Sequence, residues 1–188
     1  MYWYPKVKKY AFYVVLLFAG TTALLSCAPE DNKTDRASQT AYFPIHDFFT
    51  AEVGKLKSKN PIVDKTVWKE DKSENQKLRI KNWDVELGNF LSVDLNKPAY
   101  EQQFRIDSIA DTLRYTAINE KLDIQSVELI FNAAKVPQRI RIRKATNNTL
   151  YSNIEELLFE PGIRYVVKKE QTIRLLGKNH YQIEGKIK

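Results

Sequence analysis

The sequence predicts an α+β fold in which two early helices pack against a long, curved antiparallel β-sheet, a meander. Two patterns predict it. Apolar residues recur at three- and four-residue intervals in two early segments. After Pro98 they alternate with polar residues in short runs separated by turn residues. The length of 188 residues suits one domain, which we expect to occupy residues 41–188.

The N-terminus has the parts of a secretory signal peptide. Lys6, Lys8 and Lys9 form a basic head, and an apolar stretch follows over residues 11–25. This stretch is shorter than the about 20 residues that a membrane-spanning helix needs. We therefore expect an export signal at this end of the chain.

The end of the apolar stretch resembles the lipobox of bacterial lipoproteins. In that family an aliphatic residue precedes a Cys by three positions, and a small residue stands immediately before the Cys. Leu24, Ser26 and Cys27 occupy these positions, and Leu25 is bulkier than is usual there. The resemblance implies a lipoprotein signal peptide over residues 1–26. It also implies that the chain's single Cys is lipidated and anchors the protein in the cell envelope, at the outer membrane of a Gram-negative bacterium.

Two alternatives remain for this segment: an uncleaved N-terminal anchor, or an ordinary signal peptide followed by a chance Cys. Cleavage before Cys27 removes three Lys and no acid, so the formal net charge falls from +7 to +4. Since an exported protein of modest charge rarely meets nucleic acid, we expect no such partner. Residues 27–40 are polar and predict a flexible tether.

The first helix is predicted from Pro44 to the Asn60-Pro61 pair. Proline suits the first turn of a helix, and the residue before a proline is disfavoured in helical conformation. The apolar residues that share one helical face are Ile45, Phe48, Phe49, Val53 and Leu56.

A β-hairpin and a second helix are predicted next. Residues 62–69 and 77–81 have strand patterns, with a polar turn near residues 71–75. Asn82 is a plausible helix cap. The residues that then fall on one helical face are Trp83, Leu87, Phe90 and Leu91.

Consecutive antiparallel strands are predicted for the rest of the chain, because turn signals recur at short intervals. The turns are expected at residues 119–121, 132–137, 147–148, 160–162 and 177–179. The alternating positions are Phe104 and Ile106; Leu113, Tyr115 and Ala117; Val127, Leu129 and Phe131; Ile140 and Ile142; Ile163, Tyr165 and Val167; Ile173 and Leu175; Tyr181 and Ile183.

A row of arginines is the most distinctive charge pattern. On a strand, Arg139, Arg141 and Arg143 share one face at spacings of about 6.6–6.8 Å, and Lys144 is expected to extend the charge. Guanidinium groups in a row are suited to an anionic sugar, a phosphate or a lipid head group. The alternative, which we favour, is a solvated sheet face paired with acids of neighbouring strands, such as Glu128.

Aromatic residues are expected to fill the core. Those at predicted inward positions are Phe43, Phe48, Phe49, Trp68, Trp83, Phe90, Phe104, Phe131, Phe159 and Tyr165. The alternative is that sheet and helices enclose an apolar pocket for a lipidic ligand, an arrangement similar to envelope lipoprotein carriers in architecture only.

No catalytic, metal or cofactor motif is present in the sequence. His46 and Asp47 are adjacent on the predicted first helix and do not face each other, and His180 lies near the last strand. We expect packing or surface roles for both histidines. Adjacent acids such as Glu155 and Glu156 predict a solvated edge.

Two short segments resemble the Asp-Ser/Thr-aliphatic acceptor pattern for O-glycosylation in certain Gram-negative envelopes. They contain Ser108, between Asp107 and Ile109, and Thr112, between Asp111 and Leu113. The resemblance makes both hydroxyls candidate glycosylation sites.

These patterns together predict a lipid-anchored envelope protein that binds or scaffolds a partner without catalysis and without a cofactor. The expected partners are the membrane, through Cys27, and an envelope protein or an anionic or lipidic ligand. A carrier of an apolar ligand is the first alternative. A hydrolase of envelope polymers, using His46 or His180, is the second.

Overall fold

The computed structural model describes residues 42–188, which belong to one compact unit, Ala41–Lys188. The predicted signal peptide, Cys27 and the tether lie outside the described residues. The helices are α2 (Ile45–Lys59), α3 (Trp83–Glu86), α4 (Gly88–Leu91) and the 3₁₀ turn η1 (Pro98–Tyr100). The strands are β1 (Ile62–Lys69), β2 (Lys72–Arg79), β3 (Phe104–Ile109), β4 (Thr112–Ala117), β5 (Ile124–Phe131), β6 (Pro137–Asn147), β7 (Tyr151–Glu160), β8 (Arg164–Ile173) and β9 (Gly177–Ile187).

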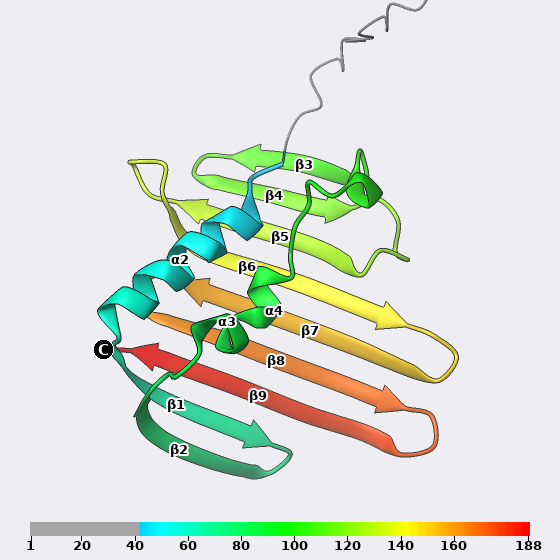
Figure 1. Cartoon of the computed structure of the whole chain (residues 1–188). Coiled ribbons are helices and arrows are strands. Elements are labelled where there is room, and N and C mark those ends of the chain that lie inside the picture. Colours follow the sequence, from blue (N-terminus) through cyan, green and yellow to red (C-terminus); the bar gives the residue numbers. More distant parts are fainter. Residues whose placement is uncertain (1–41) are drawn as a thin grey trace, which may run out of the picture. The chain divides into compact units, whose positions relative to one another are not determined.

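All nine strands form one antiparallel sheet in the order β2-β1-β9-β8-β7-β6-β5-β4-β3. Strands β3 to β9 follow one another as a meander, which confirms the predicted antiparallel sheet (Figure 1). The β1–β2 hairpin joins this meander when β1 pairs with the last strand, with Val63 opposite Ile187. The first and last strands of the described residues are therefore neighbours in the sheet, whose edge strands are β2 and β3.

Helix α2 forms as its sequence pattern predicts. Ile45, Phe49 and Val53 of its apolar face are buried. Asn60 ends the helix in the left-handed conformation (φ 44°), and its N–H donates to the carbonyl of Leu56 at 2.9 Å. Asparagine tolerates this conformation better than most residues, so the stop is local in origin. Figure 1 shows α2 lying across one face of the sheet.

The second predicted helix is correct only in part, because two single turns, α3 and α4, replace it. Asn82 caps α3 as expected, and its Oδ1 accepts from the N–H groups of Asp84 and Val85 at 3.0 and 3.2 Å. Leu87 then leaves helical geometry at φ −98° and ψ 16°. Its side chain is fully buried, so tertiary packing outweighs local helix propensity here.

The turn predicted near residues 71–75 is wrong. Strands β1 and β2 are joined by Glu70 and Asp71 alone, and residues 73–75 belong to β2. Glu70 adopts a positive φ of 50°, which lets a two-residue loop reverse the chain. The polar run that indicated a turn is instead the charged sequence of an exposed edge strand, which discourages pairing with another chain.

The turn predicted at residues 177–179 is also wrong. Residues 174–176 form the loop, and Gly177 at φ 89° begins β9 opposite Ile173. Three-residue hairpin loops commonly place a glycine in this left-handed conformation. Leu175, expected on a strand, therefore lies in the turn and is 93% exposed.

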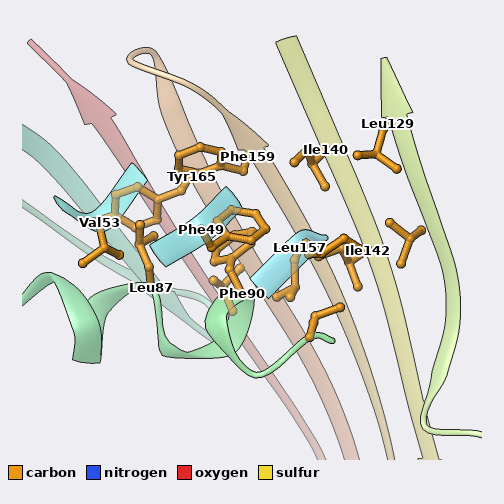
Figure 2. Close-up of a cluster of buried hydrophobic side chains, with 14 of the residues drawn as sticks. Phe49, Val53, Leu87, Phe90, Leu129, Ile140, Ile142, Leu157, Phe159 and Tyr165 are labelled. Atoms are coloured by element: carbon orange, nitrogen blue, oxygen red, sulfur yellow. The ribbon is translucent and has the colours of Figure 1, made fainter. Parts of the chain in front are cut away.

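The core lies between the helices and the sheet. Phe49 of α2 packs 5.0 Å from Phe90 in a tilted contact and 5.1 Å from Phe159 in an edge-to-face contact, measured between ring centroids. Figure 2 shows these rings against side chains of the central strands. These residues belong to the compact unit Ala41–Lys188, and so do the other core residues of the part that the structure describes. The predicted inward placement is wrong for Trp68, which lies opposite Ser73 and Gln182 on the other face.

Within the described residues, one face of the sheet is covered by helices and the other is not. Helices α2, α3 and α4 lie on one face (Figure 1). On β6, Ile140 and Ile142 are buried against that covered side, whereas the residues between them point the opposite way. We call the second side the open face. Its chemistry is set by the positions that alternate with the core.

Candidate binding groove on the open face

The arginine row lies on the open face of β6. The side chains of Arg139, Arg141 and Arg143 are 40%, 55% and 53% exposed. Their strand positions alternate with those of Ile140 and Ile142, as the sequence pattern indicates. Each arginine has an acidic partner on β5 or β7, so none presents an unopposed charge.

Glu128 on β5 binds two of the surrounding arginines. It accepts from Arg114 Nε of β4 at 3.2 Å and from Arg141 Nη1 of β6 at 3.1 Å. The hydrogen bond from Arg114 outweighs partial burial and lowers the pKa of Glu128. Glu128 is the partner that the sequence indicated for this row, and it holds strands β4, β5 and β6 together through charge.

Glu160 on β7 forms the most buried cluster of this network. Its side chain is 9% exposed and accepts from Arg139 Nε at 2.6 Å and from Arg164 Nε at 2.7 Å. Burial alone would raise the pKa of Glu160, but the hydrogen bonds from Arg164 and Arg139 outweigh it and lower that pKa. Arg164 also contacts Glu184 of β9 at 3.3 Å. The cluster therefore spans four strands.

Arg143 and Lys168 are the loosely held cations of the open face. Arg143 is 3.6 Å from Glu156, and both side chains are more than half exposed. Lys168 lies opposite Glu156 in the strand register and has no ion pair within the described part of the chain. Exposed pairs of this kind contribute little stability, typically about 0–1 kcal/mol. Both cations are therefore free to bind an added anion at low cost.

A groove of about 510 Å³ lies among these side chains. Leu158 and Val166, which face each other across β7 and β8, form an apolar floor on the open face. Val166 is only 7% exposed because the surrounding long side chains cover it. The polar residues of the groove are Arg114, Ser126, Glu128, Arg141, Arg143, Glu156, Arg164, Lys168, Gln182 and Glu184. Basic side chains thus outnumber acidic ones by five to three.

Lys144 does not extend the arginine row. It points to the helix-covered side, where its Nζ is 3.7 Å from Glu155 and 3.5 Å from Ser92 Oγ. The expectation was wrong because one residue along a strand reverses the face. Lys169 Nζ approaches the same Glu155 at 3.2 Å. Glu155 and Glu156 consequently lie on opposite faces and cannot act as a pair.

The two histidines make separate local contacts. His46 on α2 has Nδ1 2.8 Å from the carbonyl oxygen of Leu91. His180 on β9 has Nδ1 3.8 Å from Glu170, a neighbour across the strands. Neither histidine lines the groove.

The candidate glycosylation residues lie together on the β3–β4 hairpin. Ser108 is exposed, and Thr112 is partly buried, with its Oγ1 3.3 Å from Asp111 Oδ1. Ser108 stands opposite Leu113, next to the pair of Ile109 and Thr112 that closes the hairpin. Ser108 lies on the edge strand β3 and Thr112 on its neighbour β4, and neither residue lines the groove.

Several groove residues are not among the site residues predicted from the sequence. Arg114 stands between Leu113 and Tyr115, so its outward direction was readable from the local alternation. The same alternation marks Arg164 and Lys168. What the alternation does not give is the strand order that brings these residues beside the arginine row.

Residues 42–188 contain no helix long and apolar enough to cross a membrane. The same part of the chain contains no group of three or more His, Cys, Asp or Glu side chains arranged to hold a metal ion. Comparisons with protein-family models, with curated proteins and with solved structures found no match to this chain.

Proposed function

We propose that this protein is a lipid-anchored envelope protein whose folded domain is a binding module without catalytic activity. Its binding surface is the groove on the open face, and its partner is an acidic segment of another envelope protein. The observation that carries the proposal is the composition of the groove, an apolar floor surrounded by a surplus of basic side chains.

The apolar floor supports binding of a polypeptide. Leu158 and Val166 lie at the centre of the groove, with charged side chains around them. Protein interfaces commonly combine an apolar centre with a polar rim and are enriched in arginine. A single aliphatic side chain of the partner, placed on this floor, would displace water from the partly exposed Leu158.

The charge of the rim supports an acidic partner. The firmly paired arginines keep their acids occupied, whereas Arg143 and Lys168 are exposed or unpaired on the same side of the floor. A local surplus of positive charge attracts acidic segments and discourages basic ones. Arginine also binds carboxylates in a bidentate geometry.

No specific observation favours the two alternatives. The hydrolase hypothesis needs a histidine beside an acid in a cleft, and neither His46 nor His180 lines the groove. The carrier hypothesis needs an apolar pocket between sheet and helices. In the described residues that space holds the packed rings of Phe49, Phe90 and Phe159 (Figure 2).

An acidic peptide tests the groove. The probe is a fluorescent peptide with glutamates on both sides of one leucine, and the same peptide with lysines is the comparison. We expect anisotropy to show saturable, salt-sensitive binding of the acidic peptide only. Arg143→Glu/Lys168→Glu should weaken it at least about tenfold, because two attractive charges become repulsive.

The matched control for this test is Lys97→Glu/Lys121→Glu, which makes the same charge change at exposed lysines outside the groove. It should bind the acidic peptide nearly as well as the unmodified domain. Equal losses in both double variants, or equal binding of the acidic and basic peptides, would refute a specific groove.

The proposed anchor has its own test, which concerns Cys27 outside the described residues. Cells supplied with labelled fatty acid should incorporate the label into the unmodified protein and not into Cys27→Ala. Two acyl chains or more are needed for stable anchoring, since one chain binds only marginally. Equal labelling of both proteins would show that the lipid is elsewhere or absent.

A further inference from the structure

Two neighbouring hairpin turns expose an unusual concentration of aliphatic side chains. Leu150 is 72% exposed in the β6–β7 turn, and Leu175 and Leu176 are 93% and 79% exposed in the β8–β9 turn. Tyr151 beside them is 37% exposed. We call these four residues the leucine tips. Burial in an apolar environment is favourable for each leucine, and the domain itself provides none.

The two turns form one continuous surface. The N–H of Arg174 donates to the carbonyl of Leu150 at 3.1 Å, and Tyr151 pairs with Ile173 in the sheet. The side chain of Asn148 accepts from the N–H groups of Leu150 and Tyr151, both at 2.9 Å. The leucines are therefore held side by side where the strands end, at one end of the sheet.

The two turns that carry the leucine tips contain basic residues and no acid. Residues 146–152 carry no charged side chain, and residues 171–179 carry Arg174 and Lys178 with no acid. Both cations are exposed. The adjoining β1–β2 turn adds Lys69, Glu70, Asp71 and Lys72, which balance one another. The exposed leucines thus have a net positive border.

We propose that the leucine tips insert into the interfacial region of a bilayer that contains anionic lipid. Protruding leucines enter the acyl boundary, tyrosine suits the head-group level, and Arg174 and Lys178 attract lipid phosphates. This contact lies within the folded domain, so it goes beyond the proposed groove and the proposed lipid on Cys27. It orients the domain so that the strand ends that carry the leucine tips face the membrane.

The test uses residues 41–188, the compact unit that contains the described core and the nine-stranded sheet and lacks the apolar N-terminal stretch. The probes are vesicles of phosphatidylcholine with phosphatidylglycerol, and vesicles of phosphatidylcholine alone. We expect co-sedimentation with the anionic vesicles. Leu175→Ser/Leu176→Ser should reduce the partition coefficient about tenfold or more, because two apolar anchors are lost.

The matched control is Ile109→Ser/Ile163→Ser. Ile109, the last residue of β3, is 75% exposed, and Ile163, in the β7–β8 turn, is 60% exposed. Both lie at the opposite ends of the strands from the leucine tips. Unchanged binding of this control is expected. Arg174→Gln/Lys178→Gln should lower binding to anionic vesicles and reduce its sensitivity to salt. Equal losses in the leucine and isoleucine variants would overturn the proposal.

A fluorescence measurement keeps the proposal testable if a serine variant fails to fold. Leu175→Trp should add emission that shifts to shorter wavelength when anionic vesicles are present, relative to the same vesicles with the unmodified domain. An unshifted spectrum, or no sedimentation of the unmodified domain, would overturn membrane insertion and leave a protein as the partner of the tips. The acidic-peptide assay reports on the groove separately.

Discussion

At the scale of single residues, the packing of Tyr165 on Gly185 determines how β8 and β9 meet the helices. The two residues are direct neighbours across the strands. The Tyr165 hydroxyl donates to Glu86 at 2.6 Å, and Lys65 Nζ approaches the same carboxylate at 2.7 Å. Burial, followed by the contact with Glu86, raises the pKa of Tyr165. The tyrosine ring therefore has a fixed place, directly over the glycine.

We predict that Gly185→Ala lowers the free energy of unfolding by about 1–3 kcal/mol, because its methyl group would overlap the Tyr165 ring. The control is Gly54→Ala, an exposed helix position with free space around it. That variant should gain about 0.5–1 kcal/mol from helix propensity. Urea unfolding measures both, and a Gly185→Ala domain as stable as the unmodified one would contradict the packing.

At the scale of elements, Glu160 connects four strands through charge. Arg139 of β6 and Arg164 of β8 both donate to it, and Arg164 continues to Glu184 of β9. The lowered pKa of Glu160 means that the cluster stabilises the fold only while this carboxylate is ionised, so the stability falls at acidic pH. The stabilisation is fully present above the usual pKa of 4.5 and disappears as the pH falls through the lower value of the folded state.

We predict that Glu160→Gln destabilises the domain by about 1–3 kcal/mol at neutral pH, since Arg139 loses its carboxylate partner and Arg164 keeps only Glu184. The difference from the unmodified domain should shrink as the pH falls below 4.5. Thermal unfolding across this range measures it. Glu156→Gln, on the same face of the same strand but 55% exposed, should change stability by less than about 0.5 kcal/mol. Similar effects of both substitutions would contradict the role of burial.

Local elements followed from local patterns in the sequence. The extent of α2 was predictable because Pro44, the apolar face and Asn60 all act within a few residues of one another. The segment after Asn82 was harder, since the burial of Leu87 in the core breaks a helix that its pattern favours. The predicted position of the β1–β2 turn was wrong for a different reason. Its polar residues indicated a turn, but they belong to β2, an edge strand whose side chains are mostly exposed.

The candidate site was predictable only where it depends on alternation. The common face of Arg139, Arg141 and Arg143 and the pairing with Glu128 follow from period two and from neighbouring strands. The groove also needs Leu158, Arg164 and Glu184, and their positions beside one another depend on the pairing of β7, β8 and β9. No local sequence pattern predicts that register, so the groove could be recognised only in the folded structure.

At the scale of the whole domain, the packed core lies on one face of the sheet and the proposed binding groove on the other. Helices cover one face (Figure 1), and aromatic rings fill the space between them and the sheet (Figure 2). The opposite face presents charged side chains. The leucine tips lie at the ends of the strands, between these two faces. If the tips meet a bilayer, the open face stands away from the lipid and stays accessible to a protein partner.

The most direct test of the groove is site-specific photo-crosslinking in the cells that make the protein. A photoreactive residue at position 158, on the groove floor, should give a discrete protein adduct, and Arg143→Glu/Lys168→Glu should abolish it. The same residue at position 50, an exposed position of α2 on the covered side, should give none. Equal adducts at both positions, or no adduct at position 158, would contradict binding at the open face.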